Sequence, residues 1–205
     1  MSVTPEPARD NGTASSTGGP RSEGMDAAAR AAKKGPPPVH LWNPDYCGEM
    51  DLVIRADGTW MHEGTPIGRP ALVRLFASIL KREGDRYFLV TPVEKLGITV
   101  EDAPFRAVDM EPEQGGLVLE TDVGDVVTAG PDHAIRLEWT ADGEPQPYLH
   151  VRRGLEAKID RKTFYRMVEL GETMAAEGED WFGVRSGGMF FPLVRQADLE
   201  AGQRE

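Results

Sequence analysis

Hydrophobic and polar positions alternate in short runs along most of the chain, which is the pattern of half-buried strands. Leu52–Arg55 and Thr59–His62 are two such runs, and Asp57-Gly58 between them is typical of a two-residue hairpin turn. The pattern therefore predicts a β-hairpin near the start of the ordered chain.

A helical period follows this hairpin. Pro70 stands where a first helical turn tolerates proline, and Gly84 is placed to end the helix as a left-handed cap. A further strand is predicted for "RYFLVT" after the glycine. The apolar stripe of the predicted helix is Leu72, Leu75, Phe76 and Ile79.

The same order of hairpin, helix and strand occurs a second time, 92 residues further on. Apolar residues and arginines coincide at this offset, and "EGDRYFLV" resembles "EGEDWFGV" after a two-residue insertion. We infer an internal duplication. The alternative is that any two units of this type look alike. The identical pairs are Ile67 with Ile159, Arg69 with Arg161, and Arg74 with Arg166.

Short alternating segments separated by glycine-bearing turns fill the space between the two copies and follow the second. The expected fold class is α+β, with two repeats of β-hairpin, helix and strand and antiparallel sheets that are each packed by one helix. The additional strands are expected at 105–110, 117–121 and 125–129, in a hairpin around Gly154, and in a hairpin around Gly187-Gly188.

Composition divides the chain into four regions. Residues 1–40 are mainly Pro, Gly, Ser, Thr and Ala, so they bury too little apolar surface to offset their ordering entropy, and we expect a disordered tail. A first repeat domain is expected at 41–97 and a larger, β-rich second one at 98–195. Residues 196–205 are expected to be frayed.

The charge and the single cysteine restrict the function classes. A net charge of −11 disfavours general nucleic-acid binding, which relies on Lys and Arg, but it leaves room for a nucleotide in a local basic pocket. No apolar run approaches the roughly 18 residues of a membrane helix, and no secretory signal begins the chain. Together with the lone Cys47, which we expect to be a small buried residue, this predicts a cytoplasmic protein without membrane attachment.

Arg69 and Arg161 stand at the two predicted helix starts. An arginine is unfavourable at the positive end of a helix dipole by roughly 0.3–1 kcal/mol, whereas the unpaired N–H groups there bind anions. Its recurrence motivates an anion-binding hypothesis. The alternative is that each arginine pairs with a local acid, such as Glu63 or Asp160.

Aromatic, histidine and arginine residues come together on two predicted strand faces, which would suit a base and its phosphate. The ordinary alternatives are a half-buried hairpin face and a solvated strand face. The two sets are Trp60 and His62 with Arg69, and Tyr148, His150 and Arg152.

Two further sets of residues are ambiguous. Glu94, Lys95 and Asp102 lie on the predicted connection between the repeats, where they either face solvent or line the inter-repeat junction. Gly171 and Ala175 fall on the apolar stripe of the second helix, where small residues either fit the core or leave room for a ligand.

Catalytic and metal-binding motifs are missing from the sequence. The four histidines lack metal-ligand spacing, so neither a metal site nor a cofactor is predicted. No nucleophile elbow, Walker loop or dinucleotide fingerprint occurs. An enzyme is therefore the less favoured reading, with His62 or His150 as its acid–base group.

The segments "DGTW", "GTPI" with Arg69, "LVTPVEK" and "DAPF" closely resemble the bacterial domain-of-unknown-function family 1285. The resemblance covers roughly residues 41–195 and is looser in the second half, where "PYLHVR" and "LEAKI" carry it. It implies a duplicated core, a C-terminal half superficially similar to pleckstrin-homology folds, a nucleotide-like ligand between the repeats, and a signalling role.

The sequence thus favours a cytoplasmic ligand-binding or regulatory protein that holds a small anionic, nucleotide-like ligand at the inter-repeat junction. Two other classes stay open: a module that binds a protein partner without a small ligand, and a small-molecule enzyme. The candidate ligand-binding residues are Trp60, His62, Arg69, Glu94, Lys95, Tyr148, His150, Arg152 and Arg161.

Overall fold

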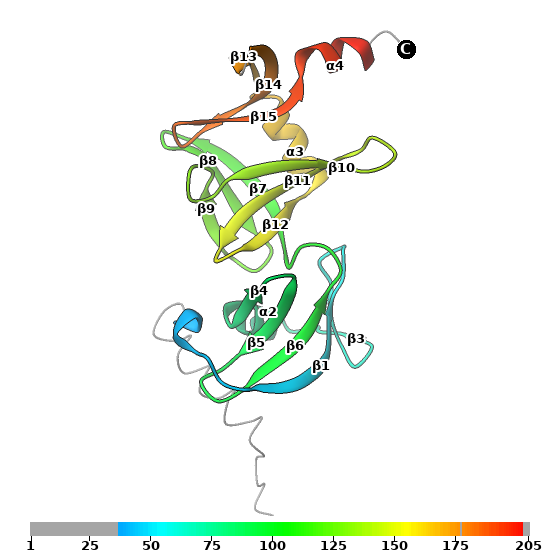
Figure 1. The fold of residues 1–205 in the computed structure, drawn as a ribbon, viewed down its shortest axis with the longest axis vertical. Coiled ribbons are helices and arrows are strands. Elements are labelled where there is room, and N and C mark those ends of the chain that lie inside the picture. Colours follow the sequence, from blue (N-terminus) through cyan, green and yellow to red (C-terminus); the bar gives the residue numbers. More distant parts are fainter. Residues whose placement is uncertain (1–36, 177, 203–205) are drawn as a thin grey trace, which may run out of the picture.

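The computed structural model describes residues 37–176 and 178–202, so residues 1–36 of the predicted tail at 1–40 lie outside the described residues. Two six-stranded curled sheets lie one above the other along the long axis, and a smaller third sheet lies at the far end (Figure 1). The chain is therefore α+β with mostly sheet, as the sequence pattern predicted. The first half here means residues 37–103, and the second half means the described residues from 104 onward.

The first sheet has the strand order β3-β2-β1-β6-β5-β4. Its central pair, β1 and β6, is parallel and the other pairs are antiparallel. The helix α2 (Pro70–Ser78) connects β3 to β4, and a short 3₁₀ helix, η1 (Val39–Leu41), precedes the sheet. The strands are β1 (Tyr46–Ile54), β2 (Trp60–His62), β3 (Thr65–Pro66), β4 (Leu80–Glu83), β5 (Arg86–Val90) and β6 (Lys95–Val100).

The second sheet repeats this topology strand for strand, with the order β9-β8-β7-β12-β11-β10 and one central parallel pair, β7 with β12. The two similar sheets are consistent with duplication. The strands are β7 (Phe105–Glu113), β8 (Gly116–Thr121), β9 (Val126–Thr128), β10 (Ile135–Trp139), β11 (Pro145–Arg152) and β12 (Leu155–Ile159).

The structural repeat differs from the one predicted at an offset of 92. Strands β1–β6 correspond in order to β7–β12, so α2 lies inside the first unit, whereas α3 (Arg161–Val168) follows the second unit. Arg69 and Arg161 therefore begin helices at different places in the two units. The offset aligned two amphipathic helices of similar length, a local likeness that does not require the same position in a fold.

The third sheet, in the order β13-β14-β15, packs on the second through Ser186. The Ser186 hydroxyl donates to the carbonyl of Ala129 at 2.7 Å and accepts the N–H of Leu117 at 2.7 Å. A helix covers most of the stretch expected to fray. These last elements are β13 (Glu172–Ala176), β14 (Glu179–Ser186), β15 (Met189–Arg195) and α4 (Gln196–Gly202).

The predicted first helix was too long. It ends at Ser78, and Leu80–Glu83 pairs with β5 instead of continuing it, while Gly84, at φ +60°, lies in the turn between these strands. Cross-strand hydrogen bonds overrode the local helical pattern. The second helix was also overextended, because Gly171 follows α3 and Ala175 lies on β13.

Strands β3, β6 and β10 were missed, in addition to β4 and β13, which were predicted as parts of the two helices. We placed Glu94 and Lys95 on a connection between the repeats. Lys95 is instead the first residue of β6 in the first sheet, Glu94 directly precedes this strand, and the expected boundary at residue 97 falls within it. Cys47 is another correction. Its side chain is exposed on β1, although we expected it to be buried.

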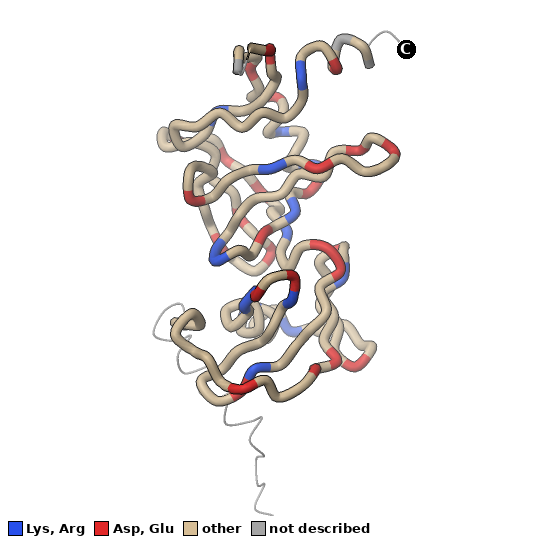
Figure 2. Tube along the Cα trace, viewed as in Figure 1, with Lys and Arg blue, Asp and Glu red and all other residues tan. Residues whose placement is uncertain are grey.

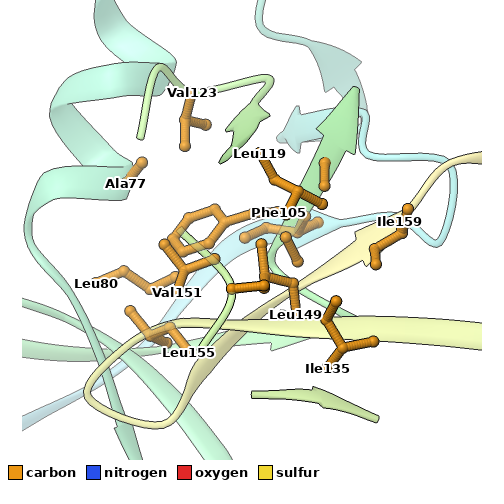
Figure 3. Close-up of a cluster of buried hydrophobic side chains, with 14 of the residues drawn as sticks. Ala77, Leu80, Phe105, Leu119, Val123, Ile135, Leu149, Val151, Leu155 and Ile159 are labelled. Atoms are coloured by element: carbon orange, nitrogen blue, oxygen red, sulfur yellow. The ribbon is translucent and has the colours of Figure 1, made fainter. Parts of the chain in front are cut away.

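The two halves share one hydrophobic core. Ala77 and Leu80 of the first half pack in the same buried cluster as Phe105, Val151 and Leu155 of the second (Figure 3). All five side chains are almost completely buried. The boundary between the halves is therefore a packed apolar interface at these residues, and a ligand at the junction has to bind beside it.

Charged residues of the two halves also lie along the chain segments that face each other at this boundary (Figure 2). The Arg82 guanidinium donates to the carbonyl of Gly154 at 3.1 Å and lies 3.9 Å from the Glu156 carboxylate. No helix in the described parts of the chain is long and apolar enough to cross a membrane.

Candidate functional site

A cleft of about 230 Å³ opens where β12 ends and α3 begins. Asp160 is the N-cap of α3, and its carboxylate accepts the Thr163 N–H at 2.7 Å, the usual reason for aspartate at this position. Arg161 follows as the first helical residue. The cleft, hereafter the α3 cleft, is lined by Arg106, Glu144, Pro145, Gln146, Pro147, Lys158, Ile159, Asp160, Arg161, Phe164 and Tyr165.

Three basic side chains and two acidic ones line the α3 cleft, in a protein whose net charge is −11. The Arg161 Nε donates to the Tyr165 hydroxyl at 2.8 Å, and this hydrogen bond raises the pKa of the guanidinium, which stays charged. Neither Arg106 nor Arg161 has a carboxylate within ion-pair distance among residues 37–176 and 178–202. The two guanidinium groups are thus free of direct ion pairs, whereas Lys158 is paired with Asp102.

The α3 cleft lies beside the boundary between the halves. A Cβ atom on Gly58, in the hairpin turn of the first half, would stand 2.5 Å from the Arg106 Cδ, so that turn packs closely on Arg106. Lys158 donates at 2.7 Å to Asp102, on the connection that joins the halves. Arg106 and Lys158 therefore link the cleft to the first half.

Tyr148 has a structural role at this connection. Its hydroxyl donates to Asp102 at 2.8 Å, and Arg136 lies over its ring at 4.2 Å. Burial, followed by the hydrogen bond with the Asp102 carboxylate, raises the pKa of Tyr148, so the hydroxyl stays protonated and continues to donate. The ring is buried and does not offer a free stacking surface.

His150 and Arg152 do not join Tyr148 on a common ligand surface. The His150 Nδ1 lies 2.7 Å from the Asp132 carbonyl, to which it must donate, and the Nε2 accepts the Gly154 N–H at 3.1 Å. Both ring nitrogens of His150 are thus engaged in hydrogen bonds to the backbone of neighbouring loops.

Arg152 leaves the strand face on which it was predicted. A register shift after His150 sets Arg152 opposite Leu155, so its side chain turns towards the core. There it pairs with Asp125, donates to the Ala77 carbonyl of α2 at 2.9 Å and lies 4.8 Å from the centre of the Phe105 ring. The bulge explains why strict alternation failed at this residue.

The candidate ligand-binding residues of the first half do not form a common ligand surface either. Trp60 is buried with its ring stacked on Phe76 at 6.5 Å, and its Nε1 has no hydrogen-bond partner among the described residues. Arg69 is exposed at the N-cap of α2, without an ion pair in the described parts of the chain. Lys95 pairs with Glu83 and lies over the Phe88 ring at 4.6 Å, so it is a structural residue of the sheet.

His62 and Glu94 do come together, in a second cavity between the first sheet and α2. No hydrogen bond joins the His62 ring to a carboxylate among residues 37–176 and 178–202. The described residues contain no cluster of His, Cys, Asp and Glu that could hold a metal ion.

Arg106 and Lys158 were missed by the sequence reasoning. Alternation in "LEAKI" and "FRAVDM" could have placed both on polar strand faces, because Leu155, Ala157 and Ile159 are the buried positions of β12. It could not have shown that β7 and β12 are parallel neighbours, with Arg106 opposite Lys158. That pairing across 52 residues creates the basic wall of the cleft.

Comparison with known proteins agrees with this two-part architecture. A domain of unknown function, the DUF1285 N-terminal domain, matches residues 37–103, and the DUF1285 C-terminal domain matches residues 104–193. The chain belongs to the DUF1285 family. A search of curated proteins found no match to this DUF1285 chain.

Two solved structures are similar to the DUF1285 chain. A DUF1285 family protein from Silicibacter pomeroyi DSS-3 has 57% identity and a TM-score of 0.77, over 86% of this chain and 98% of that one. Another from Shewanella baltica OS155 has 36% identity and a TM-score of 0.49, over 58% of this chain and 91% of that one. Both relatives are described as DUF1285 family proteins, without an activity.

Proposed function

We propose that this DUF1285 protein binds a small anionic, nucleotide-like molecule in the α3 cleft, as a non-enzymatic ligand-binding protein with a regulatory role. The observation that supports it is the convergence of Arg106, Lys158 and Arg161 on one cleft, with no carboxylate paired to either arginine among the described residues. Guanidinium groups bind phosphate and carboxylate through paired, charge-assisted hydrogen bonds.

The side chains, and not the start of α3, would hold the anion. Asp160 already occupies the Thr163 N–H and adds a negative charge at the helix end, which weakens the helix-terminus site considered from the sequence. Phe164 and Tyr165 line the same cleft and supply an aromatic surface for a base or another planar group. This arrangement suits an anion attached to a flat organic body.

The position of the cleft suggests how binding would act on the protein. Arg106 packs on the hairpin turn of the first half, and Lys158 is bound to the connection between the halves. A ligand that draws these cations together would change contacts on both sides of the boundary. We further propose that the protein acts in signal transduction in the cytoplasm. The similarity of the second half to pleckstrin-homology folds stays a prediction.

A thermal-shift screen tests the proposal. Nucleotides and phosphorylated metabolites are expected to raise the melting temperature of the full chain, whereas the matching nucleosides are not. Arg161→Gln and Arg106→Gln should each weaken binding roughly 10- to 150-fold, because each removes a charge-assisted hydrogen bond of about 1.5–3 kcal/mol. Arg69→Gln is the matched control, since Arg69 also begins a helix but lies outside the cleft.

Two results would contradict this function. One is the absence of any response to anions in the unaltered protein, and the other is equal weakening by Arg69→Gln. The alternative of a protein-interaction module predicts the first result. The observation that favours this alternative is Trp139. Its side chain is 53% exposed and lines an open, largely apolar cleft together with Trp181 and Leu199.

A further inference from the structure

A cavity of about 310 Å³ lies between the first sheet and α2, away from the α3 cleft. It is hereafter the α2 cavity. Its floor is apolar and is formed by strands β1, β5 and β6 together with the end of α2. The volume lies at the lower end of the roughly 300–1,000 Å³ of small-molecule sites. The floor residues are Met50, Phe76, Ile79, Leu89 and Leu96.

The wall of the α2 cavity is negatively charged. Glu49, Asp51, Glu63 and Glu94 line it, and no Lys or Arg does so among the described residues. Glu49 is already paired with Arg86. The carboxylates of the other three have no ion pair within residues 37–176 and 178–202, so their charge is uncompensated there.

The apolar floor and the acidic wall select for one kind of ligand. Water in contact with the floor finds few hydrogen-bond partners, so an apolar group gains by replacing it. A bare metal ion would use the carboxylates but leave the floor unoccupied.

We propose that the α2 cavity binds a small organic amine, with its ammonium group among Asp51, Glu63 and Glu94 and its apolar body on the floor. This site is independent of the α3 cleft, because it has the opposite charge and shares no lining residue with it. His62 lines the cavity beside the carboxylates.

The direct test is a two-dimensional NMR titration of the full chain with benzylamine, benzyl alcohol and benzoate. Benzylamine is expected to shift the amide signals of Met50, His62 and Leu96, and to bind about tenfold more tightly than the alcohol because of the charge-assisted contacts. Benzoate should leave these signals unchanged. Equal binding of amine and alcohol would overturn the proposal, and so would displacement of benzylamine by millimolar Mg²⁺ or Ca²⁺.

Two kinds of variant test separately how the charge and the shape of the α2 cavity contribute to benzylamine binding. Asp51→Asn combined with Glu63→Gln should reduce benzylamine binding about tenfold, whereas Glu120→Gln, an exposed acid on β8, should leave it unchanged. Met50→Trp fills the floor without changing charge and should abolish binding. Each variant is checked by its NMR spectrum for a native fold. Full benzylamine affinity in both the double variant and Met50→Trp would overturn the site.

Discussion

Single residues in this protein are fixed by partners far away in the sequence, and Glu156 is the clearest case. Its two carboxylate oxygens accept from the Arg136 Nε at 2.6 Å and from its terminal nitrogen at 2.8 Å, a bidentate pair. The hydrogen bonds from Arg136 lower the pKa of Glu156 in spite of partial burial. The carboxylate therefore contributes stability only while it is ionised.

This pKa shift predicts a pH-dependent stability. The folded-state pKa of Glu156 lies below its unfolded value of 4.5, so its contribution is complete above about pH 4.5 and is lost as the pH falls through the folded-state pKa. Glu156→Gln should lower the free energy of unfolding by about 1–3 kcal/mol at pH 7 and by less near pH 3. Urea unfolding at both pH values measures the difference.

Glu138→Gln is the control for this effect. Glu138 also contacts Arg136, but its side chain is 60% exposed, and exposed ion pairs contribute about 0–1 kcal/mol. A loss that stays the same at pH 3 and pH 7 in Glu156→Gln would contradict the assignment to ionisation.

At the scale of elements, the irregularity in β11 connects the two halves. The register shift after His150 directs Arg152 to Asp125 and to the Ala77 carbonyl near the end of α2. A regular strand would have carried Arg152 to the opposite face, away from α2. The bulge therefore turns a surface arginine into a contact between elements of different halves.

Arg152→Met tests this contact. Methionine keeps an apolar stem near Phe105 but removes the ion pair and the hydrogen bond, so we expect a loss of about 1–3 kcal/mol in the free energy of unfolding. Arg153→Met is the neighbouring control, because Arg153 is exposed in the turn that follows. Equal effects of the two variants in urea unfolding would show that Arg152 does not stabilise the boundary.

At the scale of the whole molecule, the shared hydrophobic core determines whether the two halves unfold together or separately. Leu80 of β4 is 2% exposed and belongs to the same buried cluster as Phe105 and Leu155 of the second sheet. Separation of the halves would expose this apolar surface to water at a cost of roughly 25 cal/mol per Å². The halves should therefore unfold together although each has its own sheet.

Calorimetry can examine this cooperativity. The full chain is expected to unfold in one transition, and Leu80→Ala should destabilise it by about 2–5 kcal/mol without dividing that transition. Val108→Ala, at a residue that is 39% exposed on β7, serves as a control with a small effect. Two separate transitions in the unaltered protein would contradict a common core.

Much of the local structure follows from the sequence, because turns and strands depend on near neighbours. The hairpin at Asp57-Gly58, the strands around Gly154 and Gly187-Gly188, and the start of α2 at Pro70 are all found as predicted. The ends of helices were less predictable. Leu80 continues the apolar stripe of α2, and only its pairing with β5 makes it part of a strand.

The candidate site depended more on tertiary structure. Arg161 was found from its place at a helix start, but its neighbours in the α3 cleft come from β7 and β12, which pair in parallel across a long separation. Local patterns carry no information on such pairing, because many strands of similar composition compete for it.

By itself, the sequence determined the α+β class, most of the short strands and the family resemblance, which implied a duplicated core. The tertiary structure alone decided that the repeated unit is a six-stranded sheet and that Arg152 faces the core. It also decided which charges meet in the α3 cleft and the α2 cavity. The physical reason is one of range: backbone preferences and hydrophobic periods act over a few residues, whereas sheet order and the shared core arise from contacts between residues distant in the chain.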